Sequence, residues 1–164
     1  MRKGLTSLLL ISLFSFNTAN ASLVITLPAS VCALLSNVGL STGSWINLYE
    51  NEFYCNSPYK EIGTGFPLAN NLAYYVDGNK NSVTQAKLVL NVNNKAQATS
   101  AHSALLNSSE VLSVKISGVK LSQSIKDAIT AGKPIKAKVG QTAVEVKRDN
   151  WPTGKGYELH VIFK

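Results

Sequence analysis

The feature that most constrains the fold is a stretch of alternating polarity at residues 83–93. The apolar and polar positions of this stretch alternate as follows: Ala86, Leu88, Leu90 and Val92 against Gln85, Lys87, Asn91 and Asn93. A period of two places each set on one face of a β-strand. An aromatic and β-branched run at residues 72–76 and turn-forming residues at 77–81 precede it. The sequence therefore predicts an antiparallel hairpin over residues 72–93, with one face buried.

Helical periodicity and further alternation place the other elements around this hairpin. Apolar residues at i, i+3, i+4 and i+7 predict an N-terminal helix over residues 28–38. Composition and turn signals predict the remaining segments: a hairpin at 40–55, a loop at 56–71, helices at 95–115 and 122–132, and strands at 142–148 and 157–164.

This order of elements lacks the regular strand–helix–strand alternation that builds a parallel sheet. We therefore expect an α+β fold: an antiparallel sheet of about five to six strands, with the N-terminal helix and two mid-chain helices packed on one face. The 45% hydrophobic and 15% charged content suits a globular chain rather than a disordered one.

Residues 1–21 have the pattern of a signal peptide. Arg2 and Lys3 precede an apolar run at residues 5–16, and Ala19-Asn20-Ala21 matches the small-residue site that signal peptidase accepts. The run is too short for a membrane span, which needs about 20 residues. We expect cleavage after residue 21, a single domain at residues 22–164 without a transmembrane segment, and a periplasmic or secreted location.

The two cysteines, Cys32 and Cys55, are expected to form one disulfide bond. Export brings the chain into an oxidising compartment, where an even number of cysteines usually pairs. A redox pair would favour a Cys-x-x-Cys motif, and a structural zinc site needs four soft ligands. We therefore expect no metal and no cofactor.

No sequence motif indicates a catalytic mechanism. The glycine-rich segments lack the spacing of a P-loop or a dinucleotide fingerprint, and no serine lies in a nucleophile elbow. The two histidines, His102 and His160, are interpreted as a packed helix residue and a solvated strand residue that shares a face with Glu158. Glu50 and Glu52 could act as a carboxylate pair, but their position in a hairpin turn favours exposure to solvent.

The charge distribution favours a binding function. Residues 22–110 carry four basic and five acidic side chains, whereas residues 111–164 carry ten basic and four acidic ones. Such a field attracts an acidic protein surface, an anionic lipid headgroup or a polyanion. The alternative is a lysine-rich face that only keeps the protein soluble. Thirteen of the fourteen basic residues after residue 21 are lysines, which disfavours nucleic acid as a partner because arginine makes the bidentate phosphate contacts. The candidate partner-binding residues are Lys136, Lys138, Lys147 and Arg148, with the loop aromatics Tyr59, Phe66 and Trp151.

Three segments resemble a family of small exported bacterial proteins of unknown function. They are CNSPY at residues 55–59 leading to Gly63, NNLAYYVDG at residues 70–78, and KLVLNVN at residues 87–93. The resemblance implies a periplasmic domain and no particular activity.

Together these features predict an exported binding module that recognises a protein partner of the cell envelope, as an immunity or inhibitor protein or as an accessory of an envelope system. Two alternatives stay open. An envelope hydrolase would bring His102 or the Glu50/Glu52 pair into a cleft with other polar groups. A small-molecule or polysaccharide-binding protein would expose Trp45 or Tyr75 inside a concave pocket.

Overall fold

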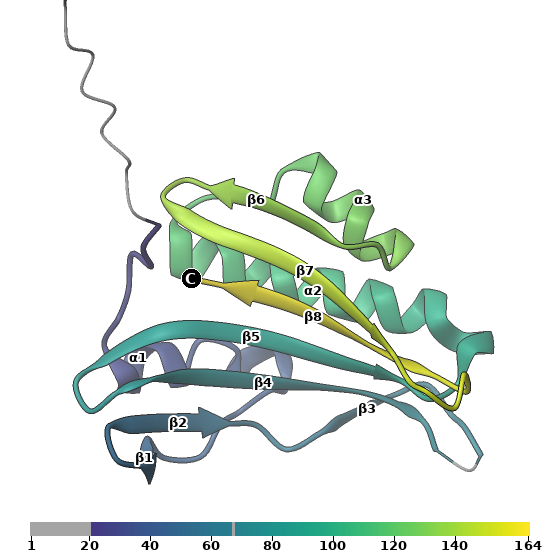
Figure 1. The fold of residues 1–164 in the computed structure, drawn as a ribbon, viewed down its shortest axis with the longest axis horizontal. Coiled ribbons are helices and arrows are strands. Elements are labelled where there is room, and N and C mark those ends of the chain that lie inside the picture. Colours follow the sequence, from purple (N-terminus) through teal and green to yellow (C-terminus); the bar gives the residue numbers. More distant parts are fainter. Residues whose placement is uncertain (1–20, 67) are drawn as a thin grey trace, which may run out of the picture.

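The computed structural model describes residues 21–66 and 68–164, which form an antiparallel sheet of eight strands with helices on one face (Figure 1). The strand order is β1-β2-β4-β5-β8-β7-β6, and β3 pairs with β4 beside this path. The strands are β1 (Ile46–Tyr49), β2 (Glu52–Asn56), β3 (Lys60–Ile62), β4 (Asn70–Asn79), β5 (Ser82–Val92), β6 (Ile135–Val139), β7 (Thr142–Asn150) and β8 (Tyr157–Phe163). The helices are α1 (Pro28–Cys32), α2 (Ala98–Ser117) and α3 (Gln123–Ala131), with short 3-10 turns at Ser36–Val38 and Lys95–Gln97.

The hairpin of β4 and β5 forms as the alternation predicts, and its buried residues face the helices. Leu72 lies opposite Leu90, and Tyr74 lies opposite Leu88, with all four side chains buried. The hydroxyl of Tyr74 donates to the carbonyl of Val31 in α1 at 3.0 Å, which fixes α1 on this face. The polar partners, such as Lys87, lie on the opposite face.

The last strand, β8, occupies the centre of the sheet. It pairs with β5 on one side and with β7 on the other, and Leu159 and Val161 are fully buried beneath the helices. All three helices lie on this side of the sheet, with α2 behind β7 and β8 in Figure 1. Because no helix among the described residues covers the other side, we call that side the open face.

The segment that precedes α1 is hydrogen-bonded to distant parts of the domain. The amide of Ser22 donates to Gln141 at 3.0 Å, and the hydroxyl of Thr142 donates to the carbonyl of Ser22 at 2.9 Å. The Cys32–Cys55 disulfide then joins α1 to β2, as predicted from the cysteine count. The predicted signal peptide lies outside the described residues except for Ala21.

The structure confirms the α+β class and the packing of helices on one face, but it corrects three details. The sheet has eight strands rather than five to six, because residues 60–62 and 135–139 also form strands. The predicted loop at residues 56–71 therefore contains β3. The predicted helix over residues 28–38 is a single α-turn followed by a 3-10 turn, because Ser36 and Asn37 are weak helix formers.

No helix within residues 21–66 and 68–164 is long and apolar enough to cross a membrane.

Candidate functional site

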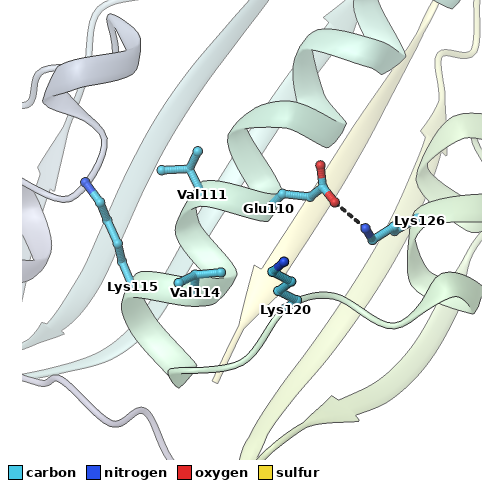
Figure 2. Close-up of a pocket in the computed structure, with 6 residues that line it drawn as sticks. All are labelled: Glu110, Val111, Val114, Lys115, Lys120 and Lys126. Atoms are coloured by element: carbon cyan, nitrogen blue, oxygen red, sulfur yellow. Dashed lines mark ion pairs between the residues drawn. The ribbon is translucent and has the colours of Figure 1, made fainter.

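A groove of about 470 Å³ lies between α2, α3 and the segment that joins them (Figure 2). We call it the lysine groove, and it is lined by Glu110, Val111, Val114, Lys115, Lys120 and Lys126. Glu110 and Val114 are four residues apart on α2, so that their side chains lie on one helix face. Val114 is 46% exposed, which leaves an apolar floor open to solvent.

The segment joining the two helices is fixed by side-chain hydrogen bonds. Helix α2 ends at Gly118, whose φ of 73° is a left-handed conformation that favours glycine. The hydroxyl of Ser113 donates to the carbonyl of Val119 at 2.7 Å, and the amide of Val119 donates to the hydroxyl of Ser117 at 3.3 Å. These bonds hold the segment that carries Lys120 at the edge of the groove.

The three lysines of the groove differ in how their charges are compensated. Lys126 forms an ion pair with Glu110, as the dashed line in Figure 2 shows. Lys115 donates to two neutral groups, the carbonyl of Leu34 at 2.5 Å and the side-chain oxygen of Asn37 at 3.3 Å. Lys120 makes no hydrogen bond or ion pair with any described residue. With three lysines and one glutamate, the groove has a net charge of +2.

The lysines that the sequence analysis selected lie on the open face, on the other side of the sheet. Lys136 forms an ion pair with Glu145 at 3.2 Å, and Lys147 with Asp149 at 2.7 Å. The hydrogen bond to Asp149 raises the pKa of Lys147. Lys138 lies opposite Ala143 on the same face. The charges of Lys136 and Lys147 are therefore offset locally, in contrast to that of Lys120.

Arg148 is separated from these lysines because its side chain points to the helix side of the sheet. Its guanidinium lies 3.6 Å from the centre of the Tyr157 ring and donates to the carbonyl of Gly132 at 3.2 Å. The structure therefore places Arg148 in the packing between α3 and the sheet.

The candidate aromatic residues do not form one patch. Tyr59 is 60% exposed, and its hydroxyl accepts a hydrogen bond from that of Tyr75 at 3.3 Å on the open face. Phe66 is fully exposed in the loop between β3 and β4. Trp151 is half-buried in the turn between β7 and β8, where its ring packs against Gly156.

His102 is a packed residue that links three elements. Its Nδ1 lies 2.9 Å from the carbonyl of Thr130 in α3, and its Nε2 lies 2.8 Å from the hydroxyl of Tyr157 in β8. Because a carbonyl only accepts, Nδ1 carries the proton in the neutral ring and Nε2 accepts from Tyr157. Glu50 and Glu52 are exposed at the β1–β2 turn, near the opposite edge of the sheet. His102, Glu50 and Glu52 therefore do not come together in the way expected of an envelope hydrolase.

Trp45 and Tyr75, the two aromatic residues expected in a ligand pocket, lie in different parts of the structure. Trp45 borders a hollow of about 390 Å³ beside Cys32, and its ring stacks on Phe53 at 6.3 Å. Tyr75 lies on the open face beneath the ammonium of Lys87, which is 5.3 Å from the ring centre. Burial and the bond with Tyr59 raise the pKa of Tyr75.

The prediction that His160 and Glu158 share a strand face is confirmed. His160 Nε2 lies 2.8 Å from Glu158 Oε2 and 3.7 Å from Asp149 Oδ2 of the neighbouring strand. Among the described residues, these three side chains form a group that could hold a metal ion.

Sequence reasoning missed the lysine groove. Its residues come from two helices and the segment between them, so no local motif contains them. The available signal was the lysine excess after residue 110, which includes Lys115, Lys120 and Lys126. A scan against protein-family models and searches of the curated proteins and the solved structures found no match.

Proposed function

We propose that this protein is an exported binding domain that recognises an acidic protein partner through the lysine groove. The observation that carries the proposal is the combination of an exposed apolar floor with an uncompensated lysine, Lys120, at its edge. Protein interfaces commonly pair a small apolar centre with a polar rim. The groove fits a partner segment in which an apolar side chain is flanked by carboxylates.

Export is supported by two features. Residues 1–21 have the composition of a signal peptide, and Cys32 and Cys55 are joined as an oxidising compartment would favour. Ser22, directly after the proposed cleavage site, is hydrogen-bonded to the rest of the domain. A periplasmic or secreted protein with these properties would meet partners in the cell envelope.

The charge pattern favours a polypeptide over an extended polyanion. A polyanion would gain from a continuous row of free cations, but Lys136 and Lys147 on the open face are paired with carboxylates. The groove instead concentrates its charge around Val111 and Val114. An acidic and partly apolar segment would satisfy both features, whereas a polysaccharide would leave the valines unused.

The first experiment places a photo-crosslinking amino acid at Val114 in cells that express the full chain. A matched control places the same amino acid at Thr84, an exposed residue of β5. We expect Val114 to capture one envelope protein that Thr84 does not capture. Equal capture at both positions, or a captured lipid or polysaccharide, would contradict the proposal.

The second experiment measures the affinity of the purified pair by isothermal titration calorimetry. An exposed ion pair contributes up to about 1 kcal/mol, and charge reversal replaces this attraction by a similar repulsion. We therefore expect Lys120→Glu to weaken binding by up to roughly thirtyfold. Lys136→Glu makes the same charge change on the open face and should leave the affinity unchanged. Equal effects of the two reversals would show that binding depends on overall charge and not on the groove.

A further inference from the structure

Three side chains on the open face bring one imidazole nitrogen and two carboxylate oxygens together. Asp149 of β7 lies directly opposite Glu158 of β8, and His160 follows two residues along β8. Their ligand atoms lie within 4.8 Å of one another. The side chains are partly accessible, with 18% of His160, 36% of Glu158 and 42% of Asp149 exposed, so that an ion from solvent can reach them.

Two carboxylates directly opposite each other on neighbouring strands repel. Here the nearest cation is Lys147, whose ammonium lies 2.7 Å from Asp149 Oδ2. That same oxygen faces His160 at 3.7 Å, while Glu158 Oε2 faces His160 at 2.8 Å. A divalent cation among the three groups would remove the repulsion between the carboxylates more fully than one lysine does.

The spacing of the three groups suits a transition-metal ion. Zinc binds imidazole nitrogen and carboxylate oxygen at about 2.0–2.2 Å, so that two ligand atoms in a tetrahedral site lie about 3.4 Å apart. The observed separations of 2.8 and 3.7 Å lie on either side of this value. The two carboxylates lie within 4.8 Å of each other, so modest side-chain movements would bring all three ligand atoms to this spacing.

We propose that His160 Nε2, Glu158 and Asp149 bind a divalent transition-metal ion of the Zn²⁺ type. One nitrogen and two oxygens suit Zn²⁺ better than Mg²⁺ or Ca²⁺, which prefer all-oxygen ligands. The three ligands leave a coordination position for water. The site lies on the other side of the sheet from the lysine groove, so it does not depend on the proposed function.

One competitor of the metal follows from the geometry. Lys147 occupies the Asp149 oxygen that faces His160, so the metal must displace this ammonium or use the other oxygen. Metal binding should therefore strengthen when Lys147 is replaced by methionine.

The experiment titrates ZnCl₂ into the untagged, oxidised protein at neutral pH and measures binding by calorimetry. Co²⁺ absorption then reports the ligand geometry. We expect one site, a loss of at least tenfold in affinity for His160→Gln and for Glu158→Gln, and a gain for Lys147→Met. Glu145→Gln is the matched control, because it removes a carboxylate from the same strand face without touching the cluster.

Thermal unfolding without metal establishes that each variant is folded before its affinity is compared. His102, the other histidine, is buried and has both ring nitrogens engaged, so it offers no second imidazole site. Absence of Zn²⁺ binding to the native chain, or equal affinities of the native chain and His160→Gln, would overturn the proposal. An equal loss in Glu145→Gln and Glu158→Gln would also overturn it, because binding would then reflect general negative charge.

Discussion

Replacing Gly132 by alanine tests whether His102 and Arg148 pack against the end of α3 as described. Gly132 has a φ of 62°, and a Cβ atom there would lie 2.8 Å from His102 Cε1 and 3.0 Å from Arg148 Nη1. Gly118 at the end of α2 has a φ of 73°, but a Cβ atom there meets nothing within 4 Å among the described residues. The two glycines therefore form a matched pair that differs mainly in the crowding around them.

The expected effects can be estimated from these contacts. Left-handed backbone costs an alanine about 1–2 kcal/mol, and this cost applies at both positions. Alanine also reduces the conformational freedom of the unfolded chain, and this effect offsets about 0.4–1 kcal/mol of the backbone cost at both positions. At Gly132 the imidazole of His102 must also move, which weakens its bonds to Thr130 and Tyr157 at about 1 kcal/mol each. We expect Gly132→Ala to lower the free energy of unfolding by about 2 kcal/mol more than Gly118→Ala.

Urea unfolding of the oxidised proteins, followed by tryptophan fluorescence, measures the difference. Unchanged m-values would show that both variants unfold in the same two-state manner. A double variant with His102→Ala should make Gly132→Ala less costly, because the clashing ring is gone. Losses within about 0.5 kcal/mol of each other for Gly132→Ala and Gly118→Ala would refute the reasoning.

Three further predictions concern the disulfide bond and the hydrogen bond that join α1 to the sheet. The double variant Cys32→Ala/Cys55→Ala opens a loop with a sequence separation of 23, and chain entropy predicts a loss of about 3.5 kcal/mol in the free energy of unfolding; a loss below about 1 kcal/mol in urea denaturation would contradict this. Tyr74→Phe removes the bond to the Val31 carbonyl and should cost about 1 kcal/mol in the same assay. Burial raises the pKa of Tyr74, so the stability linked to its neutral form is complete below the unfolded pKa near 10 and is lost as the pH rises beyond it. Above pH 10 the native chain should therefore lose stability more steeply than Tyr74→Phe, and parallel curves would exclude this linkage.

The elements with a clear period could be predicted from the sequence, whereas short ones could not. The alternation around Leu88 and Leu90 predicts β5, and the glycine stops at Gly118 and Gly132 match the ends of α2 and α3. The sequence analysis did not predict strand β6. Its five residues lie between Pro134 and Gly140, and this local pattern is typical of a connecting segment. Its partner, β7, supplies the pairing that holds it in the sheet.

The candidate sites depend on tertiary contacts that no local pattern contains. His160 and Glu158 could be placed on one strand face by alternation. Asp149 joins them only through the register of β7 and β8, which the turn around Trp151 fixes. The lysine groove is less predictable still, because it depends on how α3 packs against α2. This packing places Lys126 beside Glu110.

The central position of β8 affects when the domain can complete its sheet. Each residue of Tyr157–Phe163 pairs with β5 on one side and with β7 on the other, so β8 joins the two parts of the sheet. Before β8 is in place, β4–β5 and β6–β7 are separate hairpins that share no strand pairing. Removal of even a few residues of β8 should therefore be more damaging to the fold than a similar removal from the edge strand β1.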